Sequence, residues 1–228
     1  MSDGWDGEYR GIIQDNNDPQ KQGRCRLIVS EVLGHSVISG WAEPAVMIVG
    51  KSGDWGECNI PPVGAIVWVR FVHGYVDKPV YGKGYSPAPN AEYHLPNRAL
   101  GVAGSISKGT RDGEPGDPFA ATYPNNRVFQ TPGGHLLEFD DTPGGERIHI
   151  WHKAGAFLEI HPDGTIVTVT PGNLYTAADG SYTLRAASAD IKIVGLWNLQ
   201  AGSVRETAGT ITETAGTITN AGQCVHGS

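Results

Sequence analysis

The sequence is poor in cysteine, has no long apolar run and has no excess of basic residues, and each absence excludes a class of protein. Its cysteines, Cys25, Cys58 and Cys224, are odd in number and far apart, which favours reduced, buried thiols over disulfides or metal sites. No apolar run approaches the roughly 18 residues that a membrane-spanning helix requires. A formal net charge of −7 argues against a nucleic-acid partner. The first residues lack the basic and apolar regions of a signal peptide, so we expect a protein that stays in the cytoplasm where it is made.

Glycine and proline are abundant instead. The 32 glycines and 15 prolines among 228 residues indicate an all-β protein with many short strands and turns, and no helix of ordinary length is expected. In residues 1–88, short runs of β-branched and aromatic residues alternate with Gly, Pro, Asn and Asp. Five strands in about 80 residues predict an OB-fold barrel. The expected strands are residues 8–13, 24–30, 45–50, 65–72 and 80–83.

Two further regions follow this domain. Residues 89–130 are polar, rich in glycine and proline and without sustained periodicity, which predicts an extended connector that wraps neighbouring subunits. From residue 131 to residue 228 the chain again alternates strands with Gly-Pro corners. The strands expected there are residues 135–139, 147–152, 157–161 and 165–170.

The C-terminal region carries a short repeat. Ala-Gly pairs at Gly202, Gly209, Gly216 and Gly222 recur every seven residues and then after six. A period of seven is typical of a coiled coil, but each repeat holds one glycine, several threonines and a single large apolar residue. Such a repeat has poor helix propensity and no a/d pair to bury. A glycine corner followed by a Thr-Ile-Thr strand fits better, with one inward and two outward side chains.

The inward residue lies two positions after each glycine. Strands this short, with one core residue each, cannot form a core within one chain. We therefore predict an intertwined β-structure built from several copies, which is a rigid rod rather than a binding pocket. The predicted core column of this assembly consists of Val204, Ile211, Ile218 and Cys224.

Three segments resemble a known family. Tyr9-Arg-Gly-Ile-Ile13, with Gly23-Arg-Cys-Arg-Leu27, is similar to the opening of the OB-fold in baseplate hub spikes of phages. The run from Pro61 to Phe71 resembles the later strands of that domain. The segment from Gly134 to Ile148 resembles the junction shared by contractile-tail spikes and the valine-glycine-repeat spikes of type VI secretion.

The resemblance implies a homotrimeric central spike on the baseplate of a contractile phage tail, and hence a virion protein. Its C-terminal triple-stranded β-helix, residues 131–228 here, would face the host outer membrane, and its OB-fold domain, residues 1–88, would contact baseplate hub proteins. Some members carry a muramidase domain after the OB-fold, but residues 89–130 are too few for one, so we expect no enzymatic activity. Other members bind iron through a histidine pair at the tip, where this chain has Cys224 and His226.

Those two tip residues are the candidate metal site. Three chains could present three thiolates and three imidazoles to iron or zinc. The repeat favours a plainer interpretation, because Cys224 continues the apolar column and His226 falls in a polar, outward position. On that interpretation there is no cofactor, and a separate tip-capping protein of the proline-alanine-alanine-arginine type covers the open strand ends.

Catalytic and zinc-binding alternatives rest on a few histidines and carboxylates. His149 and His152 point to opposite faces of a strand, so they cannot chelate one ion together, and His161 adjoins a turn. All three are expected to be ordinary surface or interface histidines. Asp140, Asp141, Glu146 and Glu159 could include the two carboxylates of a glycan-degrading enzyme, although Asp141 and Asp163 belong to turn sequences in which the aspartate is expected to cap its own backbone. The other alternative is an effector-delivery spike of a type VI-like system. Secretion spikes usually place a hub domain before the OB-fold, which favours the phage hypothesis.

Overall fold

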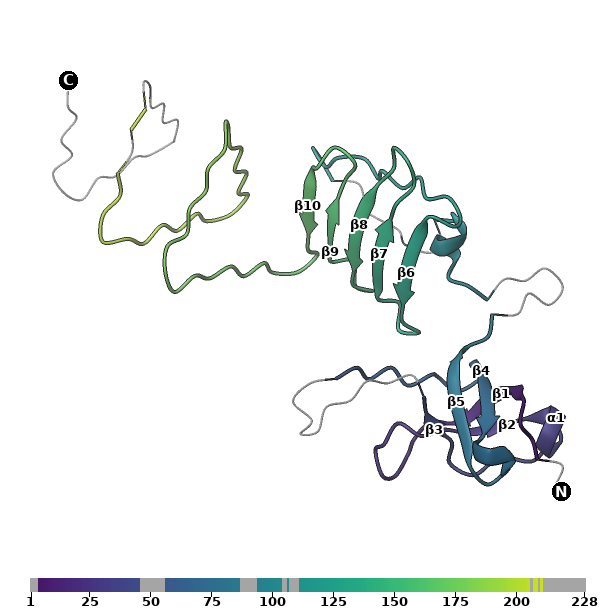
Figure 1. The fold of residues 1–228 in the computed structure, drawn as a ribbon. Helices are drawn as coiled ribbons and strands as arrows, with labels where there is room; N and C mark the ends of the chain where they lie inside the picture. The colour runs from purple at the N-terminus through teal and green to yellow at the C-terminus, as the bar shows by residue number, and fades with distance from the viewer. Residues whose placement is uncertain are drawn as a thin grey trace. The chain divides into compact units, whose positions relative to one another are not determined.

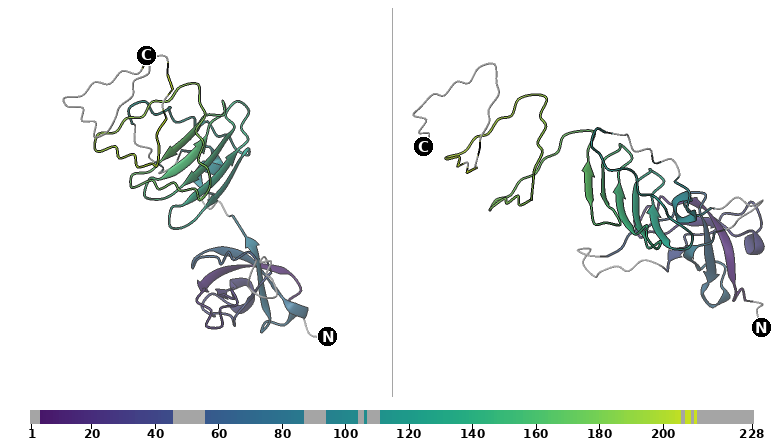
Figure 2. Two further views of the ribbon diagram at one scale, coloured as in Figure 1. Left: turned by 90° about the vertical axis from the view of Figure 1, so that its left-hand side faces the viewer. Right: turned by 90° about the horizontal axis from the view of Figure 1, so that it is seen from above.

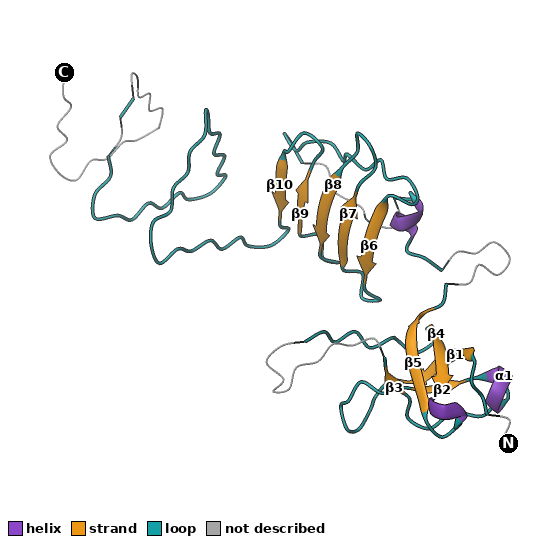
Figure 3. Cartoon of the chain, viewed as in Figure 1, coloured by secondary structure: helices purple, strands orange, loops and turns teal. Residues whose placement is uncertain are grey.

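The computed structural model describes residues 4–45, 56–86, 94–103, 106, 111–205, 207, 208 and 210. The described chain is all-β, as predicted, with two five-stranded sheets (Figures 1 and 3). Its helices are single turns, namely α1 (Ser30–Leu33), η1 (Val72–Gly74) and η3 (Asn97–Leu100). Of the strand predicted at residues 45–50, all but Ala45 lies outside the described residues.

The N-terminal sheet is the predicted OB-like domain. Its strand order is β2-β1-β4-β5-β3, with β3 parallel to β5 and the other pairs antiparallel. Two isolated bridges, Cys25 to Ala42 and Ile28 to Ile38, join β2 to the chain that leads into β3, so the sheet curls back toward itself. The strands are β1 (Glu8–Asp15), β2 (Arg26–Ile28), β3 (Glu43–Pro44), β4 (Ile66–Phe71) and β5 (Pro79–Gly84).

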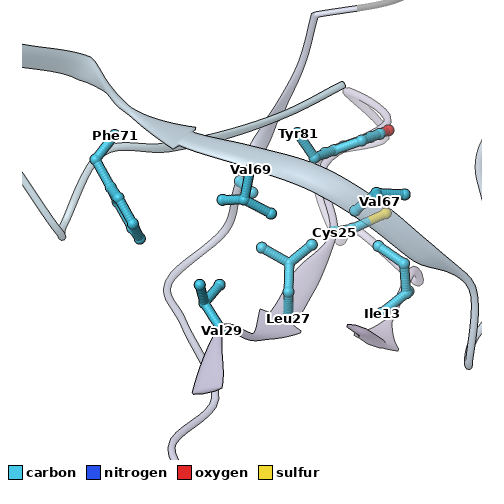
Figure 4. Packing of buried hydrophobic residues seen from close by; sticks show 9 residues of the cluster. Ile13, Cys25, Leu27, Val29, Val67, Val69, Phe71 and Tyr81 are labelled. Atoms are coloured by element: carbon cyan, nitrogen blue, oxygen red, sulfur yellow. The ribbon is translucent and has the colours of Figure 1, made fainter. Parts of the chain in front are cut away.

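Alternate residues of these strands fill one small core. Val67, Val69 and Phe71 project from β4 toward the β1 and β2 side of the sheet, where Ile13 and Leu27 lie (Figure 4). Every second residue of β4 is buried, as a strand with one inward face requires.

Two further contacts close this core. A Cβ added to Gly11 would come within 2.5 Å of a Val69 methyl group, so the glycine allows β1 to approach β4 closely. The hydroxyl of Tyr81 donates a 2.6 Å hydrogen bond to the carbonyl of Gly23. Burial raises the pKa of this phenol, which therefore stays a donor.

The second sheet is a simple antiparallel meander. Its strands lie side by side in sequence order, β10-β9-β8-β7-β6 (Figure 1, and Figure 2, right). Four of them match the four strands predicted from the sequence to within two residues at each end. The strands are β6 (Asn126–Gln130), β7 (Leu136–Asp140), β8 (Arg147–Trp151), β9 (Phe157–Ile160) and β10 (Ile166–Val169).

Tight turns set the register of this meander. Gly144 and Gly164 have φ angles of +77° and +82°, which glycine adopts without strain. The Asp163 carboxylate accepts a hydrogen bond from the backbone N–H of Thr165, so this aspartate caps its own turn as expected. At the turn between β7 and β8 the sequence prediction for Asp141 was wrong by one residue. Asp140, rather than Asp141, accepts from the backbone N–H of Thr142, because Asp140 is the inward residue at the end of β7.

The prediction of an extended connector over residues 89–130 is wrong at the C-terminal end of that range, where the structure has a strand. β6 lies inside residues 89–130, and each of its residues pairs with β7. Before β6, residues 94–103, 106 and 111–125, here called the strap, lie against one face of the second sheet. Gly101 ends η3 with a φ of +78°, and a Cβ there would lie 2.7 Å from the carbonyl oxygen of Ala121. The two halves of the strap thus meet at a position that requires glycine.

Among the described residues beyond β10, none is in a strand. These residues run as extended chain with exposed side chains and form a unit of their own by contacts, residues 176–228. The triple-stranded β-helix predicted for the C-terminal region stays a prediction.

Candidate functional site

The two faces of the second sheet differ in kind. One face, here called the covered face, lies under the strap and holds both ion pairs and a small apolar cluster. The other, the open face, carries mainly apolar side chains that are exposed in the single chain. Alternation along each strand produces the difference, because residues i and i+2 share a face.

An ionic cluster occupies the covered face. Glu138 of β7 is fully buried and lies between two arginines, Arg98 from η3 and Arg147 from β8. Arg98 Nε donates to both carboxylate oxygens at 3.0 Å, and Arg147 Nη2 donates to Oε2 at 2.6 Å. The amide of Asn126 adds a bond of 2.6 Å to Oε1. Glu138 thus joins the strap to three strands.

The cluster continues across the sheet. Arg147 Nη1 donates to Glu159 of β9 at 2.7 Å, and the other oxygen of Glu159 lies 3.1 Å from the ring nitrogen of His161. The fully buried His149 lies next to the cluster, with Nδ1 at 3.5 Å from Glu138 Oε2. Two buried arginines therefore balance two buried glutamates, which is the condition for keeping such charges out of water.

The strap contributes an aromatic ring to the same cluster. Phe119 contacts the guanidinium groups of both arginines, with its ring centroid 4.1 Å from Arg98 Cζ and 5.2 Å from Arg147 Cζ. Arg98 also donates to the carbonyl of Ala103 at 3.0 Å and accepts, through its own carbonyl, a bond from Asn126. The cluster therefore holds the strap through the side chain of Arg98 and through the backbone carbonyl of the same residue.

The charge state of Glu138 follows from these contacts. Burial alone would raise the pKa of this carboxyl, but His149, Arg98, Asn126 and Arg147 outweigh burial and lower the pKa to about 2. Glu138 is therefore ionised at neutral pH. Because the ionised Glu138 depends on both Arg98 and Arg147, the contacts of the cluster support one another.

The open face presents two rows of apolar residues across the five strands. In one row Leu137 of β7 pairs with Ile150 of β8, which pairs with Leu158 of β9. In the parallel row Phe139 pairs with Ile148, and Ile148 with Ile160. The large apolar side chains exposed on this face are Phe129, Leu137, Phe139, Ile150, Leu158 and Ile166.

A contiguous apolar surface with exposed residues on all five strands is unusual for a face that stays in contact with solvent. Scattered exposed apolar residues are ordinary, whereas contiguous patches mark interaction sites. The face continues to β10, which has no further strand beside it among the described residues, so one sheet edge is unpaired as well. The arrangement can bury a partner.

Most of the predicted core column lies outside the described residues. Ile211, Ile218, Cys224 and His226 are in that part of the chain, so both the column and the candidate tip metal site stay predictions. Val204 is described and is 58% exposed. The described chain beyond β10 exposes further apolar side chains in the same way, including Tyr182, Leu184, Ile191, Ile193, Trp197 and Leu199.

The structure separates the predicted histidines. His149 is buried beside Glu138, while His152 is exposed on the turn after β8 and its ring lies 4.6 Å, centroid to centroid, from that of His135. His149 was expected at the surface or an interface, and that expectation was wrong for the single chain because it shares the inward face of β8 with Arg147. No group of three metal-binding side chains occurs among the described residues.

The candidate carboxylates are also dispersed. Glu159 is buried in the ionic cluster, Asp140 caps a turn, and Asp141 forms an exposed ion pair with Arg127. Glu146 is exposed in the turn before β8. Arg98, Glu138 and Arg147 were not among the residues predicted from the sequence, because Arg98 lies 40 positions from Glu138 and no local pattern joins the three. In the part of the chain described, no helix is long and apolar enough to cross a bilayer.

Comparison with known proteins defines the class of the N-terminal domain. Residues 9–84 match the family of type VI secretion system and phage-baseplate injector OB domains. This range contains all the strands of the N-terminal sheet except the first residue of β1. The chain thus carries an OB domain of the injector type, and the resemblance noted in the sequence is confirmed for that domain. The resemblance of the segment from Gly134 to Ile148 lies outside the match and stays a prediction.

Two phage proteins are similar over this domain. Protein Gp5 of Vibrio phage KVP40 is 45% identical over 76 residues, which cover 33% of this chain and 18% of that protein. The pre-baseplate central spike protein Gp5 of Enterobacteria phage T4 is 41% identical over 71 residues, which cover 30% of this chain and 12% of that protein. The chain therefore spans less than a fifth of either relative, and the similarity to both is confined to the OB domain.

Proposed function

We propose that this protein is the structural central spike of a contractile phage tail baseplate, a homotrimeric rod that punctures the host outer membrane on sheath contraction. It would act mechanically, without enzymatic activity, as a component of the virion. The OB domain shared with the Gp5 proteins supports the baseplate assignment.

The open face of the second sheet is the observation that carries the proposal. A sheet that hides ion pairs on one face and exposes apolar rows on the other is complete only when a further surface covers the apolar rows. The chain's own strap is already used on the covered face. The surface that remains is that of other copies of the same chain.

The extended C-terminal chain points to the same conclusion. Its apolar side chains, from Tyr182 to Val204, are more than half exposed in the single chain. Ordering each residue of such a chain costs about 1–2 kcal/mol in backbone entropy, which isolated strands with one apolar residue each cannot offset. Intertwining with neighbouring chains pairs the strand edges and buries these side chains, and it yields a rod that resists load along its axis.

The carboxylates support a mechanical rather than a catalytic role. Glycosidases need two carboxyl groups that flank an open cleft. Here Glu138 and Glu159 are buried and paired with Arg147, so a glycan cannot reach them. The segment between β5 and β6 has about 40 residues, fewer than an additional domain requires.

The partners follow from the same assignment. Baseplate hub proteins would bind the OB domain, and a separate small protein would cap the strand ends at the tip. A metal held by Cys224 and His226 of three chains is the competing arrangement for the tip. A type VI-like delivery spike stays the second candidate function, because the matching family includes both systems. Both relatives named above are phage proteins, which favours the phage assignment.

The first prediction concerns assembly. The full chain is expected to be a trimer that persists at high dilution and resists detergent, as measured by sedimentation equilibrium or native mass spectrometry. Ile211→Asp would place three like charges around a dry axis and should abolish the rod, because buried unpaired carboxylates cost several kcal/mol each. Thr210→Asp, at the neighbouring exposed position in the same predicted strand, is the control and should assemble normally. A well-folded monomer of the unaltered chain would end the proposal.

The second prediction concerns catalysis. The purified trimer is expected to release no reducing sugar from peptidoglycan or lipopolysaccharide, because Glu159 and Asp141 already form ion pairs with arginines. Turnover that Glu159→Ala or Asp141→Ala removes, in a variant that still assembles, would favour a spike-linked glycan-degrading enzyme instead.

A further inference from the structure

The strap could cover either face of the second sheet. It enters the sheet directly at β6, an edge strand, and an edge strand gives access to both faces. Both faces also carry apolar side chains. The covered face holds Leu136, Trp151, Phe157 and Val167, and the open face holds the two apolar rows described above.

Hydrophobic burial does not favour the strap on one face of the sheet over the strap on the other face. Burial is non-directional and follows area, so the strap's apolar residues would gain from contact with either face. Several of them, Leu95, Val102 and Tyr123, are exposed even in the observed position. A strap folded over the open face would bury them against the apolar rows and block the contact between copies.

The ionic cluster is present on one face alone. Arg98 finds the buried carboxylate of Glu138 there, and Phe119 lies between Arg98 and Arg147. At the end of the strap, the backbone N–H of Thr122 donates a 2.9 Å bond to the hydroxyl of Thr142 in the β7–β8 turn. Buried ion pairs contribute little net stability compared with apolar packing, and their best-supported use is to specify one arrangement among several.

We propose that the Arg98–Glu138–Arg147 cluster is a lock that holds the strap on the covered face and so keeps the open face free for assembly. The effect of the lock on assembly rests on the proposed trimer, whereas its effect on the position of the strap does not. Without the lock, the strap moves between the faces and competes with the neighbouring copies.

The test compares two arginine variants of the full chain in a Cys58→Ser background. Arg98→Met keeps an unbranched apolar stem but removes the guanidinium group and its bonds to Glu138. We expect the backbone amide of Thr122 to exchange at least tenfold faster, and the trimer fraction at a fixed low concentration to fall at least tenfold. Arg111→Met is the matched control, because Arg111 also belongs to the strap but has an exposed side chain that pairs with Glu114 within the strap itself. It should leave both measurements unchanged.

An engineered disulfide distinguishes loss of the lock from a general loss of stability. The hydroxyl oxygens of Thr122 and Thr142 are 3.3 Å apart, so cysteines at these positions can form a bond that fixes the strap on the covered face. Adding Thr122→Cys and Thr142→Cys to Arg98→Met should restore the trimer when oxidised and lose it again on reduction.

The outcomes separate the two proposals. A wild-type chain that is monomeric contradicts the spike, while the exchange rate of Thr122 still tests the lock. Wild-type exchange and trimer content in Arg98→Met would overturn the lock. If that variant loses its β-structure, the combination Arg98→Met and Glu138→Leu removes one buried charge of each sign and leaves Arg147 paired with Glu159. Normal strap exchange and assembly in this combination would also overturn the lock, whereas fast exchange with poor assembly would support it.

Discussion

Ile150→Asp is expected to leave the protomer folded and to abolish its association. Ile150 lies in the middle strand of the open face, between Leu137 and Leu158, and half of its surface is exposed in the single chain. Aspartate there costs the isolated sheet about 1 kcal/mol through lower β-propensity. In the assembly it would bury one unpaired carboxylate per chain, each at a cost of several kcal/mol. Because about 1.4 kcal/mol corresponds to a tenfold change, the association constant should fall by at least two orders of magnitude.

Two further variants give this experiment its controls. Ala154→Asp introduces the same charge in the exposed turn after β8 and should assemble normally. Leu136→Asp, on the covered face of β7, should unfold the sheet itself, because Leu136 is buried within one chain. Sedimentation would report the mass of each variant, and circular dichroism its β-structure. An Ile150→Asp chain that still forms trimers at wild-type concentrations would show that the open face is not an interface.

The strands could be predicted because their signals are local. Alternation and Gly-Pro corners located β7, β8, β9 and β10 to within two residues at each end, and the same signals located most of the OB domain. β6 was missed because Asn126–Gln130 holds two apolar residues and follows a proline-rich stretch. Its strand conformation comes from pairing with β7, which is a tertiary effect.

The ionic cluster could not be predicted for a different reason. Arg98 and Glu138 are 40 positions apart, and nothing near either residue indicates the other. Glu138 also lies between Leu137 and Phe139, so alternation along the strand predicts that these two apolar residues face inward. From the sequence, the charged residue would be placed on the solvent side. The structure buries it and exposes its apolar neighbours, because arginines from η3 and β8 supply the countercharge.

Acid is expected to weaken the second sheet through the same glutamate. The pKa of Glu138 is lowered from 4.5 to about 2 in the folded chain. A lowered pKa contributes stability that is fully present above the unfolded pKa, near 4.5, and is lost as the pH falls toward 2. The shift corresponds to about 3 kcal/mol at neutral pH. Urea unfolding of the Ile150→Asp chain, in which association does not contribute, should therefore show a steep loss of stability between pH 4.5 and pH 2.

Glu138→Gln identifies the residue responsible. Glutamine keeps the shape of the side chain but leaves Arg98 and Arg147 without their shared carboxylate, so we expect a loss of about 3–5 kcal/mol at pH 7. The variant should also lose most of the pH dependence between 4.5 and 2, so that the two chains converge in stability near pH 2. Asp141→Asn removes a carboxylate from the exposed pair with Arg127, and it should cost less than about 1 kcal/mol with the pH dependence unchanged. If the free energy of unfolding falls equally with pH in Glu138→Gln and in its parent, another group causes the acid sensitivity, because Glu138→Gln has lost this carboxyl.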